Sequence, residues 1–338
     1  MEIKKKYTDL DKDLQTKMKE GNVFFSEEYS RYGNATGVGV WYVYDDNYIL
    51  PVFVTERVLI KQGLYVSEPL NIGSANGKRQ MAEFLNCASI YLKKAGIARI
   101  STSAAALFSV YPDDSQRIPF GSHIIDLSQS EEEIFMNMHS KHRNSVRRAE
   151  RNGVTVVSGG KELISDYIKA DSETWERSER VSYGEEFFEK ILDSLGDNAV
   201  LYVAYKNDEP QSAACYFKNR KMCYYMYGAS ITNPEPGATN LLQWVAIKDM
   251  KEEGIEKFSF VGCRINEDED SKYHGIQRFK ERFGGELCQG FMFSCDLKPM
   301  EYRIFQLLYR LKKGSTLESA IDQEIHKWPE LQKVIVEE

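Results

Sequence analysis

One order of secondary-structure elements is predicted twice along this 338-residue chain. Alternating apolar residues around a polar turn predict a hairpin over residues 38–54, which is followed by a strand over 58–66, a helix that ends at Gly96 and a strand over 97–101. From Val200 onward the same order of hairpin, strand, helix and strand returns. A chain that repeats about five elements in one order is expected to fold as two similar α+β units.

The junction between the helix and the last strand supports this duplication. KKAGIARIST (93–102) and KEEGIEKFSF (251–260) each place a glycine after a lysine-rich helix end, although such an end is common on its own. We expect each unit to be a mixed sheet flanked by helices. The expected boundaries are 1–128 for the first unit, 129–298 for the second and 299–338 for a C-terminal helical tail.

Composition narrows the class of protein. The length suits two domains of ~150 residues, and 42% hydrophobic with 28% charged residues is typical of a soluble globular protein. The N-terminal sequence lacks the apolar core of a signal peptide, and no run approaches the ~18 apolar residues of a membrane span, so we expect a cytoplasmic protein. The six cysteines form no C-x-x-C pair, which favours reduced thiols over disulfides or a zinc site.

A basic segment lies near the start of the second predicted unit. The net charge of −7 argues against non-specific coating of nucleic acid, but residues 139–151 hold five Lys or Arg residues, two histidines and one acid. The pattern predicts one or two helices over 129–152. On such a helix Arg143, Arg147 and Arg151 form one stripe that can bind phosphates. The alternative is an ordinary solvated helix face.

The segment FSFVGCRINEDEDSKYHGIQRFKERFGGE (258–286) combines a short apolar strand, an acidic loop and a helix that ends in two glycines. It resembles the end of the catalytic half of the Fem aminoacyltransferases, which attach amino acids from aminoacyl-tRNA to the peptide of cell-wall precursors. The strand, loop and helix order of 222–262 and the segment HSKHRNSVRRAERNGVTVV (139–157) are similar to the same family. The resemblance covers roughly the last two thirds of the chain.

This resemblance implies a fold for the whole chain. The order of hairpin, strand, helix and strand is that of the N-acetyltransferase (GNAT) fold, and two such units in tandem resemble the Fem architecture. Some Fem proteins carry a long antiparallel helical arm. No segment here has sustained heptads, so we expect the arm to be absent.

Lys280 is the candidate catalytic residue, because the resemblance places it where the family has a lysine credited with stabilising the oxyanion. Transfer from an activated ester needs little beyond an aligned neutral amine and that stabilisation. Phe279 and Phe283 should anchor the helix, which leaves Lys280 about 100° away to project into a cleft. The alternative is an ordinary surface cation. Arg264, which follows a strand end, is a secondary phosphate candidate.

Two tyrosines precede the loop that leads into the helix of the second repeat. Strand alternation points Tyr225 and Tyr227 to one face beside the cleft, where they could stack on a sugar, a base or a peptide. Aromatic residues at this spacing are also typical of a core strand.

The loop SITNPEPGATN (230–240) bears on the acyl donor. GNAT enzymes that use CoA hold its pyrophosphate with a loop of pattern [RQ]-x-x-G-x-[GA] at a helix N-terminus. With Gly237 as the central glycine, Pro234 stands where Arg or Gln belongs and Thr239 at the last small position. This mismatch argues against CoA, so we predict no cofactor, and the five scattered histidines predict no metal site.

The resemblance implies an acyltransferase of the Fem type, which moves an aminoacyl or related acyl group from a carrier such as aminoacyl-tRNA to an amine. The acceptor would be a nucleotide- or lipid-linked peptidoglycan precursor of the cell envelope. Two alternatives stay open. One is a GNAT-fold N-acyltransferase that uses acyl-CoA or acyl carrier protein, and the other is a non-catalytic binding module of the same fold.

The segment that begins at Pro299 adds a candidate membrane contact. Tyr302, Phe305, Leu308 and Tyr309 recur at helical spacing beside several basic residues. A basic amphipathic helix of this kind could rest on an anionic membrane, where a lipid-linked precursor would lie. The more common alternative is that it packs on its own domain.

Overall fold

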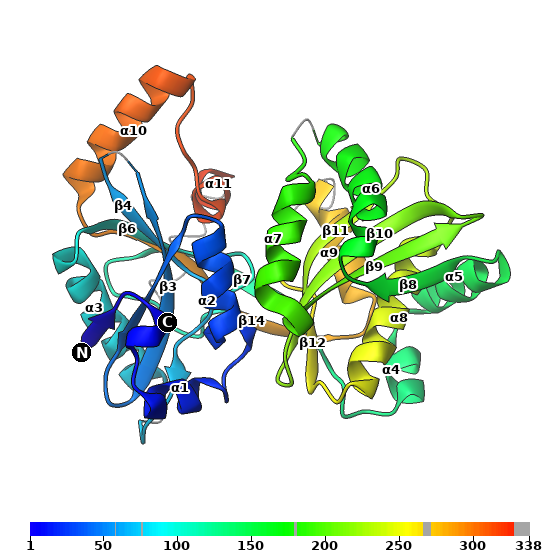
Figure 1. The fold of residues 1–338 in the computed structure, drawn as a ribbon, viewed down its shortest axis with the longest axis horizontal. Helices are drawn as coiled ribbons and strands as arrows, with labels where there is room; N and C mark the ends of the chain where they lie inside the picture. Colours follow the sequence, from blue (N-terminus) through cyan, green and yellow to red (C-terminus); the bar gives the residue numbers. More distant parts are fainter. Residues whose placement is uncertain (58, 76, 179–180, 266–271, 328–338) are drawn as a thin grey trace. The chain divides into compact units, whose positions relative to one another are not determined.

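Each predicted repeat becomes a mixed sheet that contains one pair of parallel strands joined by a helix. The computed structural model describes residues 1–57, 59–75, 77–178, 181–265 and 272–327. Its contacts divide the chain into two units (Figure 1). Unit 1 comprises Met1–Gly121 and the described residues from Gln289 onward, and unit 2 comprises Ser122–Cys288.

Unit 1 is built on a sheet with the strand order β1-β2-β3-β4-β6-β14, and β5 pairs with β3. Strands β4 and β6 run parallel, and the other neighbouring strands of this sheet pair antiparallel. The strands are β1 (Glu2–Lys4), β2 (Gly39–Tyr44), β3 (Tyr48–Glu56), β4 (Lys61–Tyr65), β5 (Leu70–Asn71), β6 (Ile97–Thr102) and β14 (Glu286–Asp296). The helices are α1 (Lys12–Met18), α2 (Glu27–Ala35), α3 (Lys78–Lys94), α10 (Pro299–Lys313) and α11 (Ala320–Lys327).

Local sequence explains the main elements of unit 1. The β2–β3 hairpin turns at Asp45, whose carboxylate accepts hydrogen bonds from the backbone N–H groups of Asn47 and Tyr48, both at 2.9 Å. Helix α3 crosses from β4 to β6 and buries the side that carries Phe84 and Leu85. Among the described residues α3 is the longest helix, with 17 residues.

Unit 2 repeats this plan with the strand order β7-β12-β11-β10-β9-β8, and β13 pairs with β7. Here β11 and β12 are the parallel pair, joined by α8. The strands are β7 (Gln116–Asp126), β8 (Thr155–Gly159), β9 (Ala199–Lys206), β10 (Glu209–Lys218), β11 (Cys223–Ser230), β12 (Lys257–Ser259) and β13 (Cys263–Arg264). The helices are α4 (Glu131–Asn137), α5 (Ser140–Arg151), α6 (Ile164–Glu176), α7 (Glu185–Leu195), α8 (Ala238–Glu252) and α9 (Lys272–Glu281).

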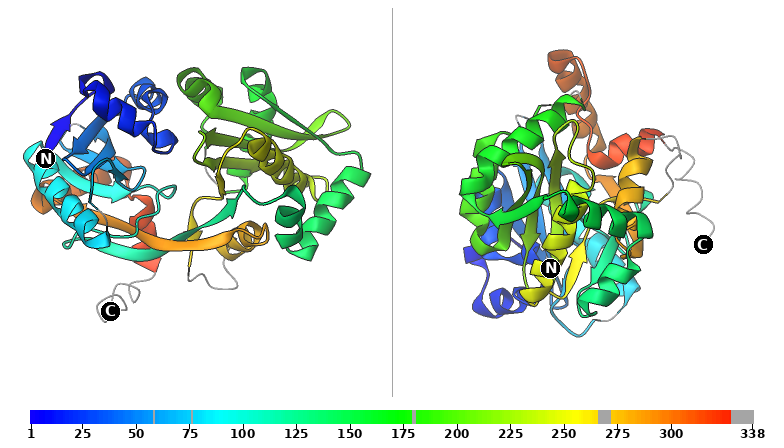
Figure 2. Two further views of the ribbon diagram at one scale, coloured as in Figure 1. Left: turned by 90° about the horizontal axis from the view of Figure 1, so that it is seen from below. Right: turned by 90° about the vertical axis from the view of Figure 1, so that its right-hand side faces the viewer.

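Helices cover both faces of the sheet in unit 2 (Figure 2). On one face the hydroxyl of Tyr216 in β10 donates to Gln243 of α8, at 2.9 Å. On the other face the next residue of β10, Phe217, contacts the ring of Tyr227, which in turn meets Phe188 of α7. Alternation along β10 therefore supplies two cores, one under α8 and one under α6 and α7.

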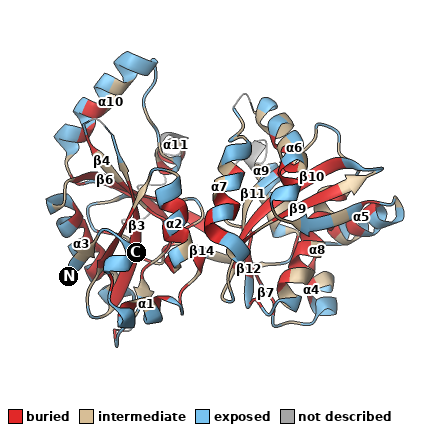
Figure 3. Cartoon of the chain, viewed as in Figure 1, coloured by how far each residue is buried: buried red, intermediate tan, exposed pale blue. Residues whose placement is uncertain are grey.

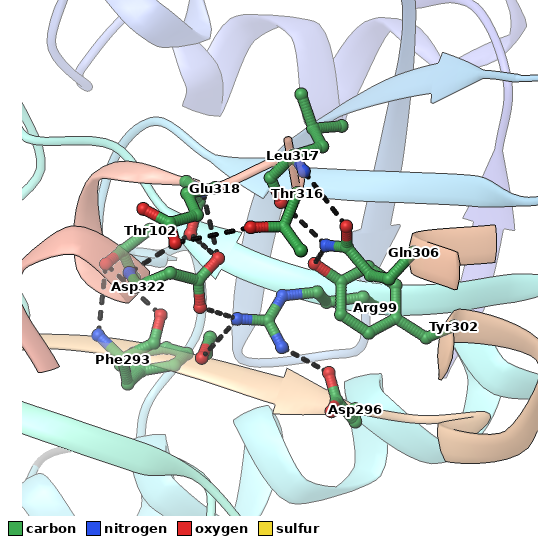
Figure 4. A network of polar contacts seen from close by, with 12 residues as sticks. Arg99, Thr102, Phe293, Asp296, Tyr302, Gln306, Thr316, Leu317, Glu318 and Asp322 are labelled. Atoms are coloured by element: carbon green, nitrogen blue, oxygen red, sulfur yellow. Dashed lines mark hydrogen bonds and ion pairs between the residues drawn. The ribbon is translucent and has the colours of Figure 1, made fainter. Parts of the chain in front are cut away.

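The described residues after 288 belong to unit 1, whereas the expected boundaries placed residues up to 298 in the second unit and a separate tail beyond. Arg99 of β6 connects these late elements. Its buried guanidinium donates to Asp296 of β14 and Asp322 of α11, and lies 4.7 Å from the ring centre of Tyr302 in α10 (Figure 4). A buried cation is stable only with such partners. Because these partners lie far away in the sequence, no local pattern indicates them.

Candidate active site

A pocket of about 670 Å³ opens in unit 2 beside the parallel strands β11 and β12. Its wall comprises the second half of β11, the loop to α8, the first turn of α8, the chain after β12 and one side of α9. Ligands commonly bind where the carboxyl ends of neighbouring parallel strands open into a crevice. We therefore take this pocket as the candidate active site.

Lys280 forms part of the pocket wall, and its ammonium group is held by the chain that follows β12. Its Nζ atom donates to the carbonyl oxygens of Val261, at 2.5 Å, and Gly262, at 2.9 Å. Burial lowers the pKa of Lys280 to about 8. An ammonium group has three N–H donors, so one N–H is left for a ligand. The side chain reaches the pocket, as the helix position suggested, but it is also tied to the backbone.

The turn that Lys280 binds has an unusual backbone conformation. Val261 has a φ of +38°, in the left-handed region that β-branched residues rarely adopt. Such a conformation costs about 1–3 kcal/mol and persists only where neighbouring contacts stabilise it. The two hydrogen bonds from Lys280 are such contacts.

The start of α5 holds the helix α9 that carries Lys280. The Nε2 atom of His142 lies 3.0 Å from the carbonyl oxygen of Phe279. The ring of His142 also packs against Phe283, with ring centres 4.7 Å apart. The backbone N–H of His139 donates to the carbonyl of Arg282. Burial lowers the pKa of His142 to about 4, so its ring is neutral at physiological pH. Part of the basic segment therefore positions α9.

A β-bulge in β11 separates the two candidate tyrosines. Cys215 of β10 pairs with Tyr227, and the next residue, Tyr216, pairs with Tyr225, so Met226 is an extra residue in β11. Strict alternation placed Tyr225 and Tyr227 on one face. The extra residue puts them on opposite faces.

The contacts of the two tyrosines follow this division. Tyr225 packs against Tyr216 with ring centres 5.5 Å apart and lines the pocket. Tyr227 meets Phe187 and Phe188 of α7, with ring centres 5.5 and 5.9 Å apart. Tyr225 is therefore a pocket residue, and Tyr227 is half-buried against α7 on the other face.

Gly228 provides the space in which the Tyr225 hydroxyl lies. A Cβ atom on Gly228 would stand 2.5 Å from Cζ of Tyr225 and closer still to its hydroxyl. Both residues line the pocket, and no described residue forms a hydrogen bond with that hydroxyl. Burial raises the pKa of Tyr225 to about 12, so the phenol stays protonated and can donate. Gly228 thus leaves one neutral donor available to a ligand.

The loop before α8 is short of free backbone donors. Pro234 and Pro236 have no N–H group. The N–H of Thr232 donates to Glu173, at 2.6 Å, and that of Glu235 donates to Gln211, at 2.8 Å. A loop that grips a pyrophosphate needs successive free N–H groups, and these four positions do not supply them.

Glu235 adds a negative charge to this part of the pocket. Its carboxylate accepts a hydrogen bond from Asn152 at 2.6 Å and has no ion-pair partner within the described part of the chain. Next to it, α8 begins at Ala238, and its N-cap residue, Gly237, has no side chain to cap the helix. The N–H groups of Thr239 and Asn240 in its first turn have no partner among the described residues. The pocket therefore offers a carboxylate and a helix N-terminus side by side.

Comparison with known proteins identifies the domain that builds this pocket. Residues 137–281 match the model of the acetyltransferase (GNAT) domain family. Over 160 residues the chain is 28% identical to the aminoacyltransferase FemA of Staphylococcus epidermidis, a match that covers 45% of this chain and 38% of FemA. The segment that lines the pocket is thus similar to the GNAT domain family, and part of the chain is similar to the Fem aminoacyltransferase FemA. It spans well under half the length of that curated relative.

Solved structures confirm the predicted α+β fold of two GNAT-like units. The crystal structure of FemX aligns with 90% of this chain and 99% of its own, with a TM-score of 0.68 and 15% identity. The structure of L-PGS from Bacillus licheniformis aligns with 85% of this chain and 92% of its own, with a TM-score of 0.52 and 13% identity. At these identities the likeness shows the fold alone.

The arginines of the predicted stripe do not line the candidate active-site pocket. Arg143 donates to the carbonyl oxygens of Met136, at 2.8 Å, and Met138, and so closes the end of α4. Arg147 lies over the ring of Phe135, 5.2 Å from its centre, and Arg151 is exposed at the end of α5.

Arg264 is half-buried in β13, and its charge contributes to lowering the pKa of Lys280. The acidic residues 267–270 lie outside the described residues. No described group of His, Cys, Asp and Glu side chains could hold a metal ion. No helix in the described ranges is long and apolar enough to cross a membrane.

Three features of the candidate active-site pocket were not predicted from the sequence. They are the close packing of the Tyr225 side chain on Gly228, the carboxylate of Glu235, and the carbonyl oxygens that accept hydrogen bonds from Lys280. A glycine within a strand often marks a close approach, so Gly228 itself was the available signal. Glu235 stands between two prolines, in a loop whose only sequence signal is its mismatch with a CoA motif. The carbonyl oxygens carry no sequence signal.

Proposed function

We propose that the GNAT domain transfers an aminoacyl group, carried as an ester on tRNA or a similar carrier, to an amine of a cell-envelope precursor. The observation that carries this proposal is the ammonium group of Lys280, which is half-buried in the pocket wall and held by two carbonyl oxygens. A preorganised cation in a site with little water is suited to stabilising an oxyanion.

In the proposed reaction the lone pair of the acceptor nitrogen forms a bond to the acyl carbon, and the electron pair of the C=O bond moves to its oxygen. The free N–H of Lys280 stabilises this oxyanion, and the hydroxyl of Tyr225 is a second donor within the same pocket. The C=O bond then re-forms and the bond to the carrier oxygen breaks. That oxygen leaves with the electron pair and takes up the proton that the nitrogen loses.

The loop before α8 supports an aminoacyl ester as the donor. Because the loop has few free N–H groups and Glu235 adds a negative charge, a pyrophosphate would meet little attraction there. The same carboxylate suits a cation. An aminoacyl ester carries an α-ammonium group, whereas acetyl-CoA carries none.

For the acceptor we propose the amine of a nucleotide- or lipid-linked peptidoglycan precursor in the cytoplasm. The similarity to FemA, which is named an aminoacyltransferase, supports aminoacyl transfer; the acceptor class follows from the resemblance of residues 258–286 to the Fem family. Arg147, Arg151 and Arg264 are the proposed contacts for phosphate groups of the substrates, since a phosphate needs cations that can reach it.

An acyl-CoA donor is the second candidate. The observation that favours it is the uncapped first turn of α8, where the N–H groups of Thr239 and Asn240 have no partner among the described residues. The N-terminus of a helix of this length is a common phosphate site. Acyl transfer to an amine would follow the same steps, with a thiolate as the leaving group.

Purified protein incubated with tRNA charged with labelled amino acids tests the proposal, with and without a nucleotide-linked muropeptide as acceptor. We expect label to move from the tRNA to the muropeptide as an amide that resists mild base, and acetyl-CoA to give no melting shift. A ligand at ~100 times its dissociation constant adds about 2.7 kcal/mol to stability. A melting shift of that size with acetyl-CoA would favour the second candidate. If neither donor gives transfer, the protein is better described as a non-catalytic binding module.

A further inference from the structure

Helix α10 of unit 1 carries apolar residues on two opposite sides. Tyr302 and Phe305 face the unit and pack with Ile60 and Ala98. On the outer side five large apolar residues are between 45% and 78% exposed: Met300, Ile304, Leu307, Leu308 and Leu311 (Figure 3). At about 100° per residue these five fall within an arc of about 100° and form one outer strip.

The outer strip is unusual for this chain. Thirteen large apolar side chains are exposed in the described residues, and five of them lie in this one strip. Single exposed apolar residues are normal on a protein surface, whereas a contiguous exposed strip marks a site of interaction. The helical spacing of Tyr302, Phe305, Leu308 and Tyr309 suggested a membrane contact through these residues. The structure uses Tyr302 and Phe305 of that set internally and exposes another face.

Basic residues border the outer strip. By helical spacing Arg303 and Arg310 lie along one edge and Lys312 along the other, and all three are exposed. None of the three has an ion-pair partner in the described part of the chain. The acid of the helix, Glu301, pairs with Lys298 at 3.3 Å. The face is therefore cationic, although the whole chain has a net charge of −7.

We propose that α10 lies in the headgroup region of an anionic lipid bilayer and inserts its outer strip between the acyl chains. A helix with one apolar side and cations along its borders binds such surfaces by burying apolar area and by attraction to anionic lipids. A second copy of the chain fits less well. Two outer strips packed face to face would bring their arginine and lysine borders together, and like charges repel. The proposal does not depend on the proposed acyl transfer.

Sedimentation of the full chain with lipid vesicles tests this inference without any activity assay. We expect binding to vesicles with about 30% phosphatidylglycerol and at least ~10-fold weaker binding to pure phosphatidylcholine. Replacing Leu307 and Leu311 together by Glu should weaken binding at least ~10-fold. Ile90→Glu is the matched control: this residue of α3 is 53% exposed but lies in no strip, so binding should stay near wild type.

Two further results would overturn the proposal. One is that the wild-type protein does not bind anionic vesicles even at low salt. The other is a wild-type dimer, detected by light scattering, that dissociates when Leu307 and Leu311 are both replaced by Glu, with no vesicle binding by either protein. The outer strip would then be a protein interface. A circular dichroism melt checks that the variants are folded. If the double variant is not, Leu311→Ser, at a position that is 77% exposed, replaces it.

Discussion

Lys280 has two roles in this molecule: it ties the turn after β12, and in the proposed reaction it stabilises the oxyanion. We predict that Lys280→Met lowers turnover ~100- to 1000-fold. Because two carbonyl oxygens lose their partner, it should also cost about 1–3 kcal/mol of stability. The matched control is Gln277→Met on the same helix, which loses a bond to Cys263 but does not line the pocket. Kinetics and urea unfolding of both variants separate the two roles, and a Lys280→Met enzyme with normal turnover would refute the catalytic one.

The pKa of Lys280, about 8, gives that role a pH signature. An oxyanion is stabilised by the charged form, which disappears as pH rises through the pKa. We therefore expect turnover to fall above about pH 8. A lysine acting as a general base would give the opposite sign, with turnover rising through the same pH.

Tyr225 and Gly228 form a pair whose substitutions should not be additive. Gly228→Ala introduces a Cβ atom that collides with the ring of Tyr225, so we predict a loss of about 1–3 kcal/mol. In a Tyr225→Ala background the collision is gone, and the same glycine change should be nearly neutral. A double-mutant cycle measured by urea unfolding gives the coupling. Equal effects in both backgrounds would show that Tyr225 does not occupy that space.

At the scale of elements, α5 and α9 are coupled through the neutral ring of His142. Burial sets its pKa to about 4 in the folded protein, against about 6.5 when unfolded. Between these values the unfolded chain binds more protons, so the contribution to stability is complete above about pH 6.5 and is lost as pH falls toward 4. His142→Gln should flatten the dependence of the unfolding free energy on pH in that window. Arg148→Gln, on the same helix, should leave it unchanged.

The arginines of α5 should divide into two groups. Arg143→Gln removes the donors that close α4 and should lower stability by about 1–3 kcal/mol, because two carbonyl oxygens lose a partner. Arg147→Gln with Arg151→Gln should leave stability near wild type. That double change should reduce the slope of log affinity against log salt for the tRNA donor, by roughly one unit per lost phosphate contact. An unchanged salt dependence of the affinity would show that the two arginines do not contact phosphates and belong to a solvated helix face.

How far the sequence predicts these elements depends on how local their causes are. The hairpin of unit 1 was predictable because Asp45 makes its own turn within three residues. The opposite orientations of Tyr225 and Tyr227 were not, because the extra residue Met226 follows from packing against β10 and has no signature of its own. Lys280 was found only through family resemblance, since charge spacing alone fits a surface helix equally well.

At the scale of the whole molecule, Arg99 determines whether the late segments stay with unit 1. Arg99→Met leaves Asp296 and Asp322 without their buried cation, and removing one partner of a buried ion pair typically costs about 3–5 kcal/mol. We expect this loss in urea unfolding, together with faster proteolysis between α10 and α11. Arg79→Met, which removes an exposed pair with Glu83, should cost at most about 1 kcal/mol. Equal losses in the two variants would contradict the role given to Arg99.

The same arginine bears on the order in which the protein folds during synthesis. Its partners Asp296 and Asp322 follow it by 197 and 223 residues. At about 5–20 residues per second, a ribosome needs roughly 10–40 s to make the first of these connections available. Unit 2 occupies one continuous stretch, Ser122–Cys288, and is complete before unit 1 has received β14. The unit that is synthesised first is therefore completed last. Until β14 has been made, the edge of β6 that pairs with it has no partner strand.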